Sequence, residues 1–200
     1  MKIIEPSVEL IDDINTADIY AKIERCGRVS RQSAPKGNPE QFIRSLIKRG
    51  HESVLEHVSF TFHIICDRAI MAELTRHRLA SFTVESTRYV KYDELTVVKP
   101  TLNPTDAINH AFLDSYLKHC EKYYRDFSHA PEGYPPEIAR AVLPLCLKSE
   151  LYMTANIRQW RHILKLRTAN DAHPQMQHVA RLILNIFREK FPVFVEDIQP

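Results

Sequence analysis

Glycine is the residue that this 200-residue sequence most clearly lacks. Only four glycines occur, Gly27, Gly37, Gly50 and Gly133, and none lies within two positions of another. Dinucleotide-binding fingerprints and P-loops need closely spaced glycines, because their backbone must approach a phosphate. The sequence therefore excludes both kinds of phosphate cradle. Any nucleotide phosphate would have to be held by arginine side chains or by helix N-termini.

Cysteine is also sparse, and long apolar runs are missing. The four cysteines form no C-x-x-C pair, which excludes a zinc ribbon and a thioredoxin-like motif. We expect them to be buried thiols in a reducing cytosol. Acidic residues interrupt the N-terminal segment before a signal-like core develops, and no uncharged run of eighteen apolar residues follows. These features predict a cytoplasmic protein with no membrane partner.

Charge is nearly balanced overall but uneven along the chain. The formal net charge is +2, so no general electrostatic footprint for nucleic acid exists and we expect no nucleic-acid partner. Residues 75–89 nevertheless hold three arginines among five serines and threonines, and residues 140–167 hold four arginines and two lysines against one acid. Arginine suits bidentate phosphate contacts. Each segment is either a local anion site or a solvated basic face.

Hydrophobic periodicity predicts an α+β fold in a single domain, residues 1–200, with a mixed, mostly antiparallel sheet packed against several long helices. Asn38 and Asp67 are placed to cap helices, and Gly50 is placed to end one. Strands are expected at residues 3–11, 58–64 and 145–153. Helices are expected at residues 17–29, 39–49, 68–78, 103–128, 137–142, 157–167 and 174–190.

One ordered set of motifs runs through most of the chain, from about residue 15 to residue 190. Its centre is the triplet Arg76-His77-Arg78, followed after seven residues by Ser86. The flanking motifs are His51-Glu52-Ser53 with Glu56-His57, Ser86-Thr87-Arg88-Tyr89, Ile138-Ala139-Arg140 with Leu143-Pro144-Leu145, and Asn156-Ile157-Arg158 with His162 and Leu166-Arg167. This pattern resembles the flavin-dependent thymidylate synthases.

The resemblance implies a fold of the thymidylate synthase-complementing type and a specific reaction. Members of the family methylate dUMP to dTMP in de novo dTMP biosynthesis. Methylenetetrahydrofolate donates the one-carbon unit, and FAD, recharged by NADPH, supplies the hydride. The family implies a homotetramer whose active sites are shared between subunits.

The resemblance also implies roles for individual residues. FAD would be bound by Ser53, Arg76, His77, Arg78, Val84, Asn156, Arg158 and His162. The nucleotide would be bound by Glu73, Arg76, Glu85, Ser86, Thr87, Arg88, Arg140 and Arg167. Relatives often have threonine at position 53, and many have Glu or Gln where this chain has Val84.

Arg167 is the expected catalytic residue, because the resemblance places it against the uracil ring. A guanidinium keeps its proton, so it can stabilise the negative charge that develops at the N3/O4 edge when C5 becomes nucleophilic. No cysteine nucleophile is needed. Cys146 lies among apolar strand residues and is expected to be an unreactive thiol. Ser86 has no base beside it in the sequence, which favours phosphate binding over nucleophilic attack.

Parts of the sequence are also compatible with two other classes of protein. A metal-dependent nucleotide phosphohydrolase would use the ten histidines and nearby acids, but no two histidines have the i, i+4 spacing of a helical metal motif, and we expect no metal. Its candidate ligands would be His51, Glu52, Glu56, His57, His63, His173 and His178. A nucleic-acid-binding module would use the two basic segments instead.

Overall fold

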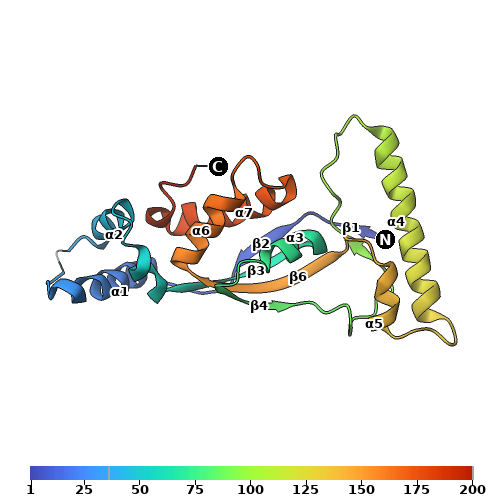
Figure 1. Cartoon of the computed structure of the whole chain (residues 1–200), viewed down its shortest axis with the longest axis horizontal. Helices are drawn as coiled ribbons and strands as arrows, with labels where there is room; N and C mark the ends of the chain where they lie inside the picture. The colour runs from blue at the N-terminus through green and yellow to red at the C-terminus, as the bar shows by residue number, and fades with distance from the viewer. Residues whose placement is uncertain (36, 200) are drawn as a thin grey trace. The chain divides into compact units, whose positions relative to one another are not determined.

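The computed structural model describes residues 1–35 and 37–199, and its fold class is α+β as predicted (Figure 1). The chain divides into two compact units. The first unit comprises residues 1–7, 65–76 and 83–151, and the second comprises residues 8–64, 77–82 and those from 152 onward. The single domain expected for residues 1–200 stays a prediction.

The second unit begins with two capped helices, α1 (Thr16–Arg28) and α2 (Pro39–Lys48), which lie side by side (Figure 1). The Asn38 side chain accepts a hydrogen bond from the Gln41 amide at 2.9 Å, as the Asn-Pro start of α2 predicts. Gly50 has φ +70°, the left-handed backbone conformation that glycine favours after a helix end. Two short 3-10 helices belong to the same region, η1 (Val29–Arg31) and η2 (Glu52–His57).

The C-terminal part of the second unit packs α6 (Ile157–Arg167) beside α7 (Pro174–Lys190), with the short helix η4 (Pro192–Phe194) after them. Aromatic rings form the centre of its core. Phe62 meets the Trp160 ring edge-on at 4.9 Å, and Phe60 stacks on Phe191 at 4.6 Å. The indole N–H of Trp160 donates to the Phe60 carbonyl at 3.1 Å, so this buried polar group is satisfied. These contacts attach α6 to the sheet.

One four-stranded sheet has the strand order β2-β3-β6-β4. Its strands are β2 (Ser7–Leu10), β3 (Ser59–Asp67), β6 (Lys148–Asn156) and β4 (Ala80–Val84). In the second unit, Ile157 N donates to Val58 O, and the hydroxyls of Thr61 and Thr154 lie 2.9 Å apart. This register runs in opposite directions along the two strands, so β3 and β6 are antiparallel, as expected.

The first unit has its own small core. Its helices are α3 (Arg68–Leu74), α4 (Ala107–His129), α5 (Pro136–Ala139) and the short η3 (Arg140–Val142), and a parallel pair joins β1 (Lys2–Ile3) to β5 (Thr96–Val97). Leu95, Tyr124, Ala139 and Leu147 are buried together. The core therefore fixes α4 and α5 to the segment that leads into β6.

Four expected boundaries were wrong, and the first three have a local reason. The strand predicted at residues 3–11 splits into β1 and β2 around Pro6, which has no N–H to donate. The helix predicted at residues 103–128 begins at Ala107, because Asp106 accepts the Asn109 amide and forms its cap. The strand predicted from residue 145 begins at Lys148, after a turn in which Leu147 N donates to Pro144 O.

The fourth correction concerns the basic triplet. The helix predicted at residues 68–78 ends at Leu74, so residues 76–78 lie outside it and do not form its last turn. The sequence analysis also missed β4, which follows at Ala80–Val84 and alternates between half-buried and exposed residues. Pairing with the sheet therefore outweighs the helical periodicity at this point. Within the described residues, no helix has the length and apolar character needed to cross a membrane.

Candidate functional site

A cavity of about 630 Å³ in the second unit collects several of the predicted FAD residues. It lies at the start of α6, where the Asn156 side chain accepts the Gln159 amide at 2.8 Å and caps the helix. Arg158 and His162 are one helical turn apart and both line it, as their spacing predicts. The full lining is Glu52, Glu56, Leu79, Asn156, Arg158, Gln159, Arg161, His162 and Lys165.

Arg158 is available to an anion at the wall of this cavity. Its Nη1 lies 2.5 Å from Glu56 Oε1, and the two side chains are 54% and 44% exposed. Ion pairs this exposed contribute about 0–1 kcal/mol. An anionic ligand that reaches Arg158 therefore has little free energy to overcome in separating it from Glu56.

Arg161 has a different role, because its side chain is only 1% exposed. Its guanidinium donates to both carboxylate oxygens of Asp197 at 2.7 and 2.9 Å, to Glu52 at 3.1 Å, and to the Phe194 carbonyl. Hydrogen bonds from Arg161, aided by Lys165, hold the pKa of the Asp197 carboxyl well below its ordinary range. This network holds α6 against η2 and the C-terminal segment, and so fixes the wall of the cavity that α6 forms.

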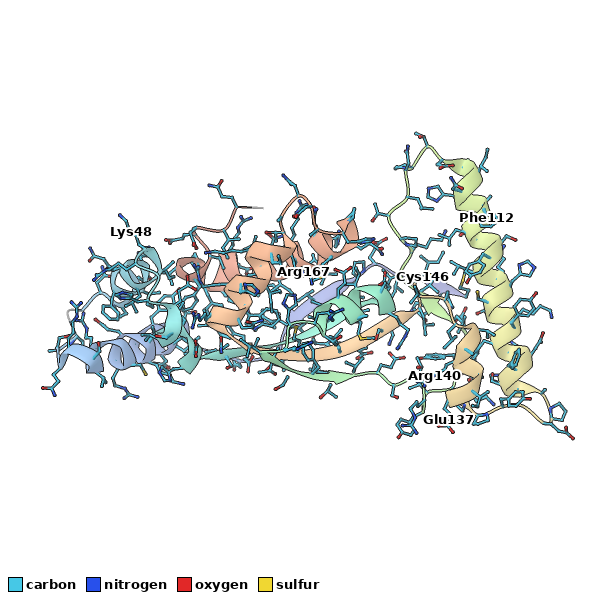
Figure 2. All side chains as sticks on the ribbon, in the orientation of Figure 1. Lys48, Phe112, Glu137, Arg140, Cys146 and Arg167 are labelled. Carbon is cyan, nitrogen blue, oxygen red and sulfur yellow. The ribbon has the colours of Figure 1, made fainter. Side chains whose placement is uncertain are left out.

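His77 and Arg167 contact each other in the second unit (Figure 2 labels Arg167 on α6). Arg167 Nε donates to His77 Nε2 at 3.1 Å, and the two residues are 90 positions apart in the chain. His77 is 6% exposed. Burial first, then the charges of Arg167 and His162, lower the pKa of His77 to about 4. The imidazole is therefore neutral near pH 7.

The remaining predicted FAD residues are more scattered. Ser53 is exposed on η2, next to the cavity residue Glu52, and Arg78 is exposed in the segment before β4. Arg76 and Val84 belong to the first unit. The structure thus gathers Asn156, Arg158 and His162 around one cavity but does not bring all eight predicted residues to it.

Most of the predicted nucleotide residues lie in the first unit, and four of them, residues 85–88, lie in a tight turn after β4. The amides of Tyr89 and Val90 both donate to Ser86 O at 3.1 Å, and Ser86 Oγ accepts the Arg88 amide at 3.3 Å. Thr87 is buried in the same turn. Glu73 is half-buried on α3, and Arg76 is exposed just beyond that helix.

Glu85 anchors this turn. Its carboxylate accepts the Tyr92 hydroxyl at 2.7 Å and pairs with Lys148 at 2.6 Å, and its amide donates to the Glu150 carbonyl at 2.8 Å. Burial and the bond to Glu85 raise the pKa of Tyr92. The contacts with Lys148 and Glu150 hold the first residue of the turn against β6, and the bond from Tyr92 ties it to the segment after the turn. The Glu85 side chain is therefore engaged within the protein, and its predicted nucleotide contact stays a prediction.

Arg88 and Arg140 converge on one acidic residue. Arg88 Nη2 lies 3.4 Å from Glu137 Oε2, and Arg140 Nε donates to the Glu137 carbonyl at 3.1 Å (Figure 2 labels Glu137 and Arg140). Both arginines are exposed. Two arginines 52 positions apart in the sequence thus meet at α5, an arrangement that can bind a phosphate dianion.

Sequence reasoning assigned no role to several residues of these sites. In the sequence, Glu56 is part of a motif and a candidate ligand of the metal-dependent alternative, and its spacing from Arg158 in the chain gives no sign of their pairing. Arg161 looks like one more basic residue of residues 140–167, because a single sequence does not show which helical position is buried. Gln159, Lys165 and Leu79 also line the cavity, and Glu137 joins the two arginines.

The thiols do not form a nucleophilic centre. Burial raises the pKa of Cys146 to about 11, and burial raises that of Cys66 to about 12. A thiol with a raised pKa is a poor nucleophile near neutral pH. All four cysteines are free; Cys66 and Cys120 are buried as expected, whereas Cys26 and Cys146 are half-buried.

Comparison with known proteins identifies similar chains. A family model described as thymidylate synthase complementing protein matches residues 9–193. A Mycobacterium phage D29 protein named "Probable flavin-dependent thymidylate synthase" is 34% identical over 94% of this chain and 86% of its own. The flavin-dependent thymidylate synthases of Thermotoga neapolitana and Kosmotoga olearia are 33% and 32% identical, over 92% and 84% of this chain and 87% and 82% of theirs.

The Arg161 network predicts an acid-dependent stability. Since Asp197 has a lowered pKa in the folded protein, its contribution to the free energy of unfolding is present above its ordinary pKa of about 3.9. This contribution is lost progressively as the pH falls below that value. We expect Asp197→Asn to lower the free energy of unfolding by about 1 kcal/mol at pH 7. Urea unfolding between pH 7 and pH 3 should show this difference shrinking with pH.

Asp126→Asn is the matched control, because Asp126 pairs with Lys122 on the exposed face of α4. It should change the free energy of unfolding by less than about 0.5 kcal/mol at pH 7. An Asp197→Asn effect that stays constant down to pH 3 would contradict the assignment.

Proposed function

The chain belongs to the family of thymidylate synthase complementing proteins, and from this premise we propose that it is a flavin-dependent thymidylate synthase. It methylates dUMP to dTMP, with methylenetetrahydrofolate as the one-carbon donor and NADPH as the reductant. The observation that carries the proposal is the cavity at the start of α6, which Asn156, Arg158 and His162 all line.

The donors around this cavity fit FAD. Arg158 and Lys165 offer cationic donors suited to the diphosphate, and the Asn156 and Gln159 side chains offer amide groups. Neither a glycine-rich turn nor a metal is needed for such contacts. Ser53 and Arg78 are exposed nearby in the chain and are proposed to contribute, as are Arg76 and Val84. When bound, reduced FAD supplies the hydride of the reaction.

The turn at residues 85–90 and the two arginines at α5 are proposed to hold the nucleotide. Ser86 and Thr87 supply hydroxyl donors, and Arg88 and Arg140 supply charge-assisted bonds to the phosphate. The phosphate takes the place of the Glu137 carboxylate beside Arg88. Because the Arg88–Glu137 pair is exposed and loose, this exchange requires little free energy.

Arg167 is proposed to contact the uracil ring and to act in the chemical step. As a permanent cation it stabilises negative charge on the N3/O4 edge while C5 becomes nucleophilic. Its Nε donates to the neutral imidazole of His77, so this contact adds no negative charge beside the guanidinium. The raised thiol pKa values fit a mechanism without a cysteine nucleophile.

The enzyme is proposed to be a cytoplasmic homotetramer whose subunits share active sites. An exposed apolar stripe on α4 supports assembly: Ile108 is 83% exposed and Phe112, labelled in Figure 2, is 72% exposed. Tyr116, Tyr123 and Phe127 continue it at helical spacing. Contiguous exposed apolar side chains of this size are typical of protein interfaces. Nucleic acid and membranes are not proposed as partners.

FAD binding tests the cavity assignment. Arg158→Ala removes a charge-assisted contact, so we expect its FAD dissociation constant to rise about 10- to 100-fold. Quenching of flavin fluorescence on titration with the protein measures this constant. Arg44→Ala is the matched control, because Arg44 pairs with Glu40 and Glu196 away from the cavity. Equal FAD affinities for wild type, Arg158→Ala and Arg44→Ala would contradict the assignment of FAD to this cavity.

Nucleotide binding tests the first unit separately. We expect Arg88→Ala to weaken dUMP binding about 10-fold or more while leaving FAD content unchanged, because Arg88 contacts only the phosphate. Calorimetric titration with dUMP measures the effect. Arg181→Ala, an exposed arginine bonded to Gln177 on α7, is the control.

Titration of the wild-type chain with dUMP and with long DNA distinguishes the enzyme from a nucleic-acid-binding module. A nucleic-acid-binding module would bind long DNA with strong salt dependence and would show no preference for dUMP. That outcome for the wild-type chain would reject the nucleotide site.

A further inference from the structure

We infer that His77 is a positioning residue for Arg167: its unprotonated Nε2 accepts the Arg167 Nε–H and sets the direction in which the guanidinium faces uracil. The inference rests on the proposed function, in which Arg167 contacts the substrate. It gives His77 a role different from the FAD contact that the family resemblance implies.

The geometry brings two separate parts of the second unit together. Arg167 is the last residue of α6, and His77 lies between α3 and β4. Their side chains meet at 3.1 Å, with His77 nearly buried and Arg167 half-buried. A long arginine side chain at the end of a helix loses substantial rotamer freedom when it is held in one direction. A buried acceptor supplied by another segment limits that freedom before the substrate arrives.

The chemistry of the contact requires a neutral imidazole. Guanidinium N–H groups only donate, so His77 Nε2 must be unprotonated and the ring proton must reside on Nδ1. The groups that face the ring are Arg167 and His162, both from α6, while Arg76 and Arg78 flank it in the chain. Burial, then the charges of Arg167 and His162, oppose protonation and keep the acceptor available.

A neutral acceptor also suits the function of Arg167 better than a carboxylate would. A carboxylate would neutralise much of the positive charge that the uracil ring needs. The imidazole holds the guanidinium and itself adds no negative charge beside it. The His77 pKa of about 4 means that the contact is present at neutral pH and is lost only under acidic conditions, when protonation would place two cations together.

A double-mutant cycle on the FAD-loaded enzyme tests the inference. The readouts are the FAD absorbance, the dUMP dissociation constant, and release of tritium from C5 of labelled dUMP. We expect His77→Leu, which keeps apolar volume but removes the acceptor, to lower the tritium-release rate about 10- to 100-fold with unchanged FAD content. His77→Gln places a neutral oxygen near the position of Nε2 and should recover most of this loss.

The double variant gives the sharper test of whether His77 acts through Arg167. If His77 acts through Arg167, adding His77→Leu to Arg167→Ala should cause no further loss of rate. Additive losses in the double variant, or a His77→Gln variant as slow as His77→Leu with FAD bound, would overturn the inference. So would a His77→Leu variant as fast as wild type. A FAD-loaded wild type that releases no tritium would instead reject the proposed function, and the inference with it.

Discussion

The candidate cofactor site depends on the hydrogen bonds and ion pairs of the buried Arg161 guanidinium. It joins α6 to Glu52 of η2 and to Asp197 and Phe194 of the C-terminal segment. A charge this deeply buried is tolerated only when its partners satisfy it. Once α6 is fixed in this way, its exposed residues Arg158 and His162 face a common cavity. The same helix therefore uses one arginine for structure and leaves others for ligands.

This division of labour explains how a chain with four glycines can serve nucleotide chemistry. In the proposed sites, arginines take the place of backbone approach to phosphate. These arginines pair with exposed carboxylates, Glu56 for Arg158 and Glu137 for Arg88. Such pairs keep the side chains near their positions and release them at little cost in free energy. Arg167 also contacts a neutral group, since its Nε donates to the His77 imidazole, which adds no negative charge beside the guanidinium.

Local chemistry made much of the fold predictable. The caps at Asn38 and Asp67 and the stop at Gly50 were read correctly, since each depends on a few neighbouring residues. The end of α3 was not, because pairing of β4 with a strand distant in sequence decides it. For the site, the spacing of four residues places Arg158 and His162 on one face of α6, and both line the cavity. The partners Glu56, Glu137 and Asp197 come from distant segments, and spacing alone does not indicate them.

The most direct test of the account is conversion of dUMP to dTMP by the purified chain loaded with FAD, with NADPH and methylenetetrahydrofolate present. The account predicts dTMP formation by the wild type, and loss of that activity in Arg167→Ala with FAD content unchanged. A FAD-loaded wild type that binds dUMP but forms no dTMP would contradict it. Wild-type turnover by Arg167→Ala would contradict the assigned role of the guanidinium.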